Sequence, residues 1–278
     1  MKTLFDHTRA STLQASTHLL CEIGSYGVSC IWYTVQPLTI RGVRMYHFNE
    51  HASGSEVAGH LRQLLNGPDF SGKVIYVCLN QKESMLIPSA HFSHAQLPAM
   101  MNLVFGKDDG SLRTDTIHQS EVLGGQLCYN AYRVHSEIIS VLGKAVPGAV
   151  IHHSSTLQLK CSRSSTSLCV IVYHHIMKLM LFDGNRLRFV QQFLYKTPSD
   201  AAYLLLNACH QHGLAPENVS LDLSGIIDKD SNLYREIIKY FLDVNLQAVQ
   251  EGVELDEELD KVSSHYFSHL TNLVKCVS

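Results

Sequence analysis

The hydrophobic positions of residues 167–225 predict three strands in succession, a helix and a fourth strand. The four strands are predicted from apolar runs at 168–173, 176–182, 187–194 and 219–223. Thr197, Pro198 and Asp200 provide a capping hydroxyl, a proline at the first helical position and an acid three residues after the cap. This combination is typical of a helix start, and Gly213 is expected to end the helix.

The same order of elements occurs nearer the N-terminus. Three apolar runs, a helix and a fourth apolar run are found at 19–23, 28–35, 43–48, 55–66 and 73–79. Gly67 and Pro68 follow the helix and favour its termination there. The sequence therefore predicts a βββαβ unit that is present twice.

Two βββαβ units in one chain resemble the layout of the actin-like ATPase fold, which has two ribonuclease H-like lobes. Residues 195–205 and 221–225 are, in addition, similar to the signature of an uncharacterised bacterial family with this fold. The resemblance covers nearly the whole chain and implies an α/β protein of two lobes. We place the boundary in the small polar stretch 163–166, which gives domains at 1–165 and 166–278.

The remaining segments are expected to complete the two lobes. Between the repeats, short elements are predicted at 85–88, 97–105, 127–134, 136–144 and 149–152. After the second repeat, Ser231 is expected to cap a helix, and 244–246 is expected to form a short edge strand. Residues 254–275 carry one apolar stripe and predict a C-terminal amphipathic helix, which either packs on the chain's own lobes or enters a partner's groove. The first alternative is favoured because terminal amphipathic helices usually dock internally.

Composition excludes several classes of function. The chain has 278 residues, of which 45% are hydrophobic, and this is enough for two modest folded domains. Its formal net charge is −3 and its basic residues are scattered, so no nucleic acid partner is expected. Neither a signal peptide nor an apolar run of membrane-spanning length is recognised. The expected location is therefore the cytoplasm.

Cysteine and histidine are abundant enough to raise the question of a metal site. None of the eight cysteines forms a pair with the two-residue spacing that zinc sites favour, and most lie in apolar runs, so buried thiols are expected. Among the 17 histidines, His265 and His269 have the spacing that places two imidazoles on one helical face. A solvated polar helix face is the preferred interpretation, because no third ligand lies within helical reach. No metal ligand is assigned.

The resemblance implies a nucleotide held between the lobes by three turns, with ATP and magnesium as the candidate ligands. In the first turn, Glu22, Gly24, Ser25 and Gly27 could hold a metal and offer backbone N–H groups to phosphate, although a glycine turn between two strands is more often a simple hairpin. The adenosine end of the cleft is represented by Ser224 and Gly225. In the second turn an acid and glycines are expected, but the sequence is Val172, Tyr173, His174 and His175. The phosphate site is therefore expected to be filled by side chains.

These observations favour a non-catalytic actin-like protein that acts through protein–protein interaction and has a degenerate interlobe nucleotide cleft. The alternative is an ATP-binding or slowly ATP-hydrolysing enzyme, supported by the glycines and serine of the first turn. A metal-dependent enzyme that uses the histidines is a third, weaker hypothesis. No catalytic residue is assigned, because the chain has no Walker loop, no dinucleotide fingerprint and no nucleophile elbow. The expected partner is another protein.

Overall fold

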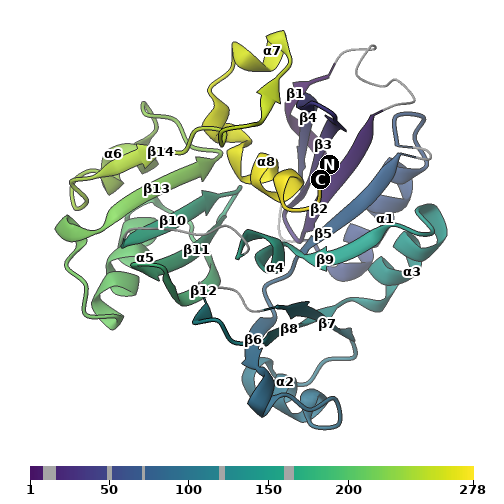
Figure 1. The fold of residues 1–278 in the computed structure, drawn as a ribbon, viewed down its shortest axis with the longest axis horizontal. Helices are drawn as coiled ribbons and strands as arrows, with labels where there is room; N and C mark the ends of the chain where they lie inside the picture. The colour runs from purple at the N-terminus through teal and green to yellow at the C-terminus, as the bar shows by residue number, and fades with distance from the viewer. Residues whose placement is uncertain (9–16, 49–51, 71–72, 119–122, 160–165) are drawn as a thin grey trace.

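Two α/β lobes lie beside each other, with a smaller sheet between and below them (Figure 1). The computed structural model describes residues 1–8, 17–48, 52–70, 73–118, 123–159 and 166–278. The βββαβ order that the sequence predicts twice is confirmed in both lobes.

The first lobe is built on a sheet in the strand order β1-β4-β3-β2-β5-β9, with β15 paired to β4. Its strands are β1 (Lys2–His7), β2 (His18–Gly24), β3 (Gly27–Val35), β4 (Leu38–His47), β5 (Val74–Asn80), β9 (Val150–His153) and β15 (Glu254–Leu255). Strands β2 to β4 are antiparallel, whereas β5 runs parallel to β2 and to β9. Helices α1 (Gly54–Leu65) and α3 (Ser136–Ala145) contribute to the apolar core on one face of this sheet.

The second lobe repeats this topology in the strand order β12-β11-β10-β13-β14. Its strands are β10 (Ser167–Val172), β11 (Ile176–Asp183), β12 (Arg186–Leu194), β13 (Ser220–Gly225) and β14 (Val244–Leu246). Two helices, α5 (Pro198–Gln211) and α6 (Asn232–Ile237), pack on this sheet, and η4 (Pro216–Asn218) precedes β13. Because β13 is parallel to β10, the carboxyl ends of both strands point toward the first lobe, where ligands bind in open α/β sheets.

A third sheet, in the order β6-β8-β7, is inserted between β5 and α3. It consists of β6 (Ser84–Pro88), β7 (Ser111–Ile117) and β8 (Cys128–Val134), accompanied by η2 (Ser89–His91) and α2 (Leu97–Phe105). Strands β1 and β7 are not predicted from the sequence, because their polar side chains give no clear hydrophobic run. Pairing with a neighbouring strand supplies the order that their own side chains do not specify.

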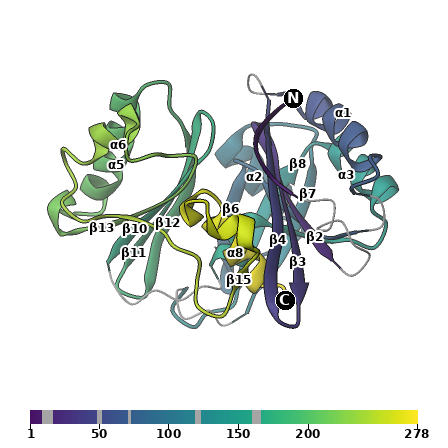
Figure 2. The same ribbon diagram turned by 90° about the horizontal axis from the view of Figure 1, so that it is seen from above.

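The prediction of one continuous helix over 254–275 is wrong. The segment forms β15, then α7 (Glu257–Asp260), η5 (Ser264–Tyr266) and α8 (Ser268–Lys275). Backbone pairing of Glu254 and Leu255 with β4 competes with helix formation, and the Asp256 side chain caps a new helix by accepting from the Glu258 N–H. The apolar stripe does pack internally, since Leu270, Leu273 and other residues of the segment join the core on the second face of the first sheet (Figure 2).

Two other expectations have different outcomes. All the described cysteines except Cys276 are buried, as expected; Cys161 lies outside the described residues. Most of the proposed boundary at 163–166 also lies outside them, so the division into two domains remains a prediction.

Among the helices of the described chain, none is both long and apolar enough to cross a membrane. A short helix, α4 (Ser154–Gln158), occupies the stretch that carries the chain toward the second lobe.

Helix α5 begins as predicted. The Thr197 hydroxyl accepts a hydrogen bond from the Asp200 N–H at 3.1 Å, and the Asp200 carboxylate accepts from the Thr197 N–H at 3.0 Å. Thr197→Ala is expected to lower the free energy of unfolding by about 1 kcal/mol, the usual cost of losing a helix cap. Urea denaturation measures the change. The matched control is Ser199→Ala, an exposed hydroxyl two residues along, which should change stability by less than about 0.5 kcal/mol; equal effects would contradict the capping role.

Candidate functional site

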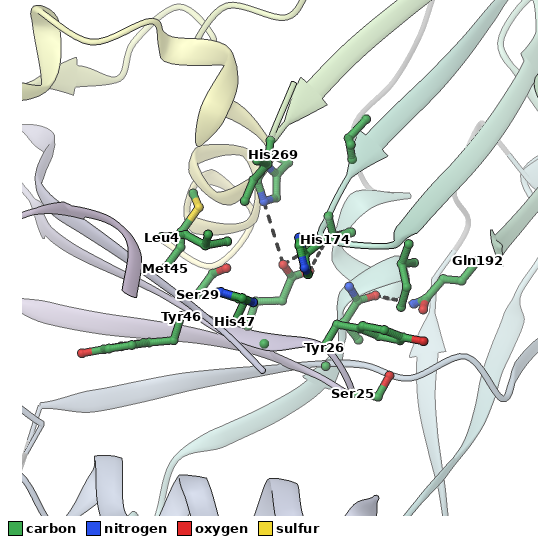
Figure 3. Close-up of a pocket in the computed structure, with 18 residues that line it drawn as sticks. Leu4, Ser25, Tyr26, Ser29, Met45, Tyr46, His47, His174, Gln192 and His269 are labelled. Carbon is green, nitrogen blue, oxygen red and sulfur yellow. Dashed lines mark hydrogen bonds and ion pairs between the residues drawn. The ribbon is translucent and has the colours of Figure 1, made fainter. Parts of the chain in front are cut away.

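The carboxyl ends of the parallel strands of both lobes meet at a small pocket, which we call the interlobe pocket. The first lobe contributes Glu22, Gly24, Ser25 and Gly27 together with parts of β3, β4 and β5, and the second lobe contributes the turn after β10. Figure 3 shows Ser25 of the first lobe and His174 of the second among the lining side chains. His269 of α8 also lines the pocket. The cavity volume is about 40 Å³, which accommodates about three water molecules. Pockets that bind ligands of drug size have volumes of roughly 300–1,000 Å³.

Glu22 is the acid of the first turn, and its carboxylate is already engaged. The side chain is 3% exposed, and the Tyr173 hydroxyl lies 3.1 Å from each carboxylate oxygen and donates to this group. Nε2 of His269 lies 4.0 Å from the same carboxylate. Burial raises the pKa of Glu22, although the positive charge of Lys178 and the hydrogen bond from Tyr173 oppose this shift.

Lys178 carries a buried amine from the second lobe into the first. It lies on β11 with 1% exposure, and its Nζ donates to Ser154 Oγ at 2.7 Å and to Asn80 Oδ1 at 3.2 Å. Gln192 of β12 donates to the same Asn80 oxygen at 2.5 Å. Burial lowers the pKa of Lys178 to about 8, against the attraction of Glu22. We refer to Glu22, Asn80, Ser154, Tyr173, Lys178 and Gln192 as the interlobe polar network.

Two neutral histidines border this network. His269 is 3% exposed, and neither of its ring nitrogens has a hydrogen-bond partner within the described chain. His153 is fully buried, and its Nε2 donates to the Gln81 carbonyl at 3.0 Å. Burial, reinforced by the nearby Lys178 charge, lowers the pKa of each ring to about 3. Both rings are therefore uncharged at neutral pH.

The predicted histidine pair does not form a shared metal site. Nε2 of His265 donates to the Ile227 carbonyl at 2.7 Å, whereas the His269 ring faces Glu22. Over the residues that the structure describes, no group of three or more His, Cys, Asp or Glu side chains is arranged to hold a metal ion. The buried environment of both rings also corrects the interpretation of a solvated helix face.

Two of the predicted site glycines, Gly27 and Gly225, lie against neighbouring backbone that leaves no room for a side chain. A Cβ on Gly27 would lie 2.2 Å from the Tyr46 carbonyl oxygen, and a Cβ on Gly225 would lie 2.2 Å from the Val172 carbonyl oxygen. Gly225 also has a φ of +88°. Neither Gly24 nor Gly27 has a positive φ, so this turn does not adopt the phosphate-binding nest that its glycines would permit.

The other predicted residues are divided between two places. Ser25 lines the interlobe pocket with Gly24, whereas Ser224 is buried and its hydroxyl donates to the Val170 carbonyl of the neighbouring strand. Ser224 lines a separate cavity of about 20 Å³ on the far side of His269. The structure therefore brings the first-turn residues together and places Ser224 at a separate cavity, whereas Gly225 pairs with Val172, which lines the interlobe pocket.

The second turn carries rings at the edge of the pocket. His174 contacts His47 of the first lobe, with 4.7 Å between the ring centroids, and His175 has a φ of +64°. Tyr173 and His174 both line the pocket, as expected for a turn that has aromatic side chains in place of glycines. Burial, followed by the effects of His175 and His47, lowers the pKa of His174.

A family model described as a protein of unknown function, DUF3822, matches residues 7–244. The chain belongs to the DUF3822 family. No curated protein matches it in sequence.

Solved structures show the fold of this DUF3822 protein. It is similar to a Bacteroides thetaiotaomicron protein with an actin-like ATPase fold and unknown function, with 15% identity, a TM-score of 0.71 and coverage of 96% of this chain and 99% of that one. It is also similar to a chain of the PilM-PilN type IV pilus biogenesis complex, with 14% identity, a TM-score of 0.60 and coverage of 94% and 98%. The DUF3822 chain therefore has the actin-like ATPase fold.

Sequence reasoning missed most of the interlobe polar network. Asn80, Ser154 and Gln192 are ordinary polar residues in the sequence, and only the tertiary structure brings them together. Lys178 did carry a signal, because it is the one charged residue in the otherwise apolar run 176–182. A lysine within a buried strand requires a polar partner, and this requirement could have indicated a site between the lobes.

The glycine contacts give a first prediction for this site. Gly225→Ala is expected to destabilise the DUF3822 protein by at least about 2 kcal/mol, because the new methyl group would overlap the Val172 carbonyl in a strained backbone conformation. The control is Gly59→Ala within α1, where no atom lies within 4 Å of the added Cβ. Urea denaturation should show this control to be stabilised by roughly 0.5–1 kcal/mol. Similar urea midpoints for both variants would contradict the close approach.

The buried imidazoles give a second prediction, for pH dependence. The imidazoles of His153 and His269 are neutral in the folded protein, whereas in the unfolded chain they take up a proton near pH 6.5. Their contribution to the free energy of unfolding is therefore complete above pH 6.5 and is lost as the pH falls toward 3. Between pH 7.0 and 5.5 the unfolding free energy should fall by about 2 kcal/mol. The raised pKa of Glu22 opposes this loss at lower pH.

Urea midpoints of His269→Asn across this range provide the measurement. The variant should lose up to about half of the pH-dependent decrease, since His153 remains and His174, whose pKa is also lowered, contributes as well. His210→Asn, at an exposed position of α5, should retain the full decrease. A pH dependence that is unchanged in His269→Asn would show that this imidazole is not the source.

Proposed function

We propose that this DUF3822 protein is a non-catalytic actin-like protein that acts by binding other proteins, with its interlobe nucleotide site closed by its own side chains. The observation that carries the proposal is the contact between Tyr173 and Glu22. The acid that would anchor a metal in the first lobe accepts the Tyr173 O–H of the second lobe, which lies 3.1 Å from both of its oxygens. The site's polar groups therefore hold the lobes together.

Phosphoryl transfer requires positioned metal ions and positive charge around the γ-phosphate. Magnesium prefers oxygen ligands in octahedral geometry and retains several waters, so it needs open space next to a carboxylate. The turn after β10 provides Tyr173 and His174 in that space, and the cavity of about 40 Å³ excludes a triphosphate. The buried Lys178 amine is also used internally, because Ser154 and Asn80 accept its hydrogen bonds.

The alternative is an ATP-binding or slowly hydrolysing enzyme. Its support is that Glu22, Gly24 and Ser25 do line the interlobe pocket. To admit a nucleotide, the lobes would have to rotate apart and break the hydrogen bonds between Tyr173 and Glu22. The cost of leaving a buried carboxylate without its partner opposes such opening unless the ligand replaces the lost contacts.

The expected partner is a protein. One of the similar folds belongs to a chain of the PilM-PilN complex, and in such a complex an actin-like body is part of an assembly of proteins. The proposal for this chain includes a protein partner and a cytoplasmic location. It also includes a division of the lobes near residues 163–166.

The proposal predicts no useful turnover of ATP. A ligand present at 100 times its dissociation constant adds about 2.7 kcal/mol of stability, so a thermal shift in millimolar Mg-ATP is a sensitive assay of binding. We expect little or no shift, together with phosphate release at the background rate. The same assays on Glu22→Ala and Gly24→Val identify any activity that belongs to the pocket, and Glu217→Ala serves as an exposed acid control. Release that both pocket variants abolish and the control retains would contradict the proposal.

A further inference from the structure

A second cavity lies outside the interlobe pocket, between the small sheet and the second lobe. Its volume is about 670 Å³, within the range of sites that bind ligands. One wall is β6, with residues 84–86 and 88, and the other wall is β12, with residues 186–190. Cys128 and Asn130 of β8 also line it. We call this cavity the β6–β12 groove.

The groove runs along the edges of two strands. Successive side chains of a strand point to opposite faces of its sheet, so a cavity on one face contacts alternate residues. Consecutive residues of β12, from Arg186 to Val190, line the groove, as do three consecutive residues of β6. Strands β6 and β12 are each the last strand of their sheets in the described part of the chain, and Figure 1 shows them near each other below the second lobe. The groove is therefore bordered by two sheet edges.

A sheet edge offers backbone N–H and C=O groups to an added strand. Edges of this kind bind extended peptides through main-chain hydrogen bonds, while side-chain pockets give specificity. The register of β11 with β12 contains a one-residue bulge at Arg188, because Leu187 pairs with Phe182 and Phe189 pairs with Leu181. Bulges occur at sheet edges near functional sites, where they re-aim side chains and limit unspecific pairing.

Side chains along β12 indicate the chemistry of the peptide. Arg186 and Arg188 are exposed, and only the second has an ion pair among the described contacts, with Asp183. Because Asp183 neutralises Arg188, Arg186 supplies the uncompensated positive charge of this edge; the neighbouring Glu83 carboxylate is paired with Arg133 at 2.8 Å and does not cancel it. Leu187 and Val190 are half-buried and present apolar surface beside the arginines. A strand that alternates acidic and apolar side chains matches both features.

We propose that the β6–β12 groove binds an extended peptide segment of a partner protein, with alternating acidic and apolar residues, by strand addition to β6 and β12. This inference rests on the proposed function, because it assigns the surface through which a non-catalytic protein meets its partner. The small sheet shares a core cluster with the second lobe through Ile117, Cys128 and Phe182 beneath the groove. The two edges therefore form a fixed site before the peptide arrives.

The test uses a fluorescein-labelled seven-residue peptide that alternates glutamate and valine, with fluorescence anisotropy as the readout. The native protein should bind this peptide at least about tenfold more tightly than a lysine–valine peptide of the same length. Arg186→Glu combined with Arg188→Glu should weaken binding by about tenfold or more. Arg62→Glu combined with Lys144→Glu makes the same charge change at exposed positions of α1 and α3 and should leave binding unchanged.

Strand addition has its own readout. The same glutamate–valine peptide with alternate backbone amides methylated should lose its binding, and amide hydrogen exchange in residues 186–190 should slow in the complex. Equal binding of the acidic and basic peptides, or equal losses in the two double variants, would overturn the charge assignment. Retained binding of the methylated peptide would overturn strand addition.

Sedimentation of the native protein tests whether another copy of the chain, and not a partner's peptide, occupies the groove. A concentration-dependent dimer that Arg186→Glu with Arg188→Glu abolishes would assign the groove to another copy of the chain and overturn the peptide proposal. Failure of the proposed non-catalytic function can be distinguished from failure of the groove proposal, because Mg-ATP turnover is measured without the peptide. Turnover abolished by Glu22→Ala would overturn that function while leaving the groove measurements to stand on their own.

Discussion

The structure depends on a buried amine. Lys178 comes from a strand of the second lobe, and an unpartnered ammonium in this position would cost several kcal/mol. Ser154 and Asn80, which belong to the first lobe, accept its hydrogen bonds, and Glu22 supplies a nearby negative charge. The two lobes cannot separate without leaving this amine and the Glu22 carboxylate without their partners. Their relative position is therefore fixed by polar contacts at the point where an actin-like fold has its cleft.

The same contacts connect fold to function. Both lobes keep the topology in which parallel strands direct their carboxyl ends at a shared site, and the first turn still carries an acid, two glycines and a serine. The chemical groups at that site, however, satisfy one another across the lobes through Tyr173, Lys178 and Gln192. The His269 ring has no hydrogen-bond partner within the described chain, but at the paired groups a ligand gains little, because each new contact replaces an existing one.

The sequence predicted the fold well where local signals agree with tertiary structure. Apolar runs and the Thr197 cap located the repeated unit, because strand periodicity and capping are properties of neighbouring residues. Residues 254–275 had a helical stripe, but pairing of Leu255 with β4 and the cap at Asp256 divided it, and this competition is not local. The polar network was mostly unpredictable for the same reason, since Asn80 and Lys178 are 98 positions apart in the chain.

The position of the β6–β12 groove follows from the way the lobes are joined. Strand β6 belongs to a sheet whose Tyr132 and Val134 are part of the first lobe's core, whereas β12 belongs to the second lobe. The width of the groove therefore depends on how the lobes are joined, both by the Lys178 contacts and by the shared cluster of Ile117, Cys128 and Phe182. In a nucleotide-driven protein the angle between the lobes would change with the bound ligand. Under the proposed function the interlobe site stays closed and the two strand edges keep one separation, and a fixed separation lowers the entropic cost of adding a strand between them. The proposed closure of the nucleotide cleft and the proposed peptide site in the groove thus rest on the same buried contacts.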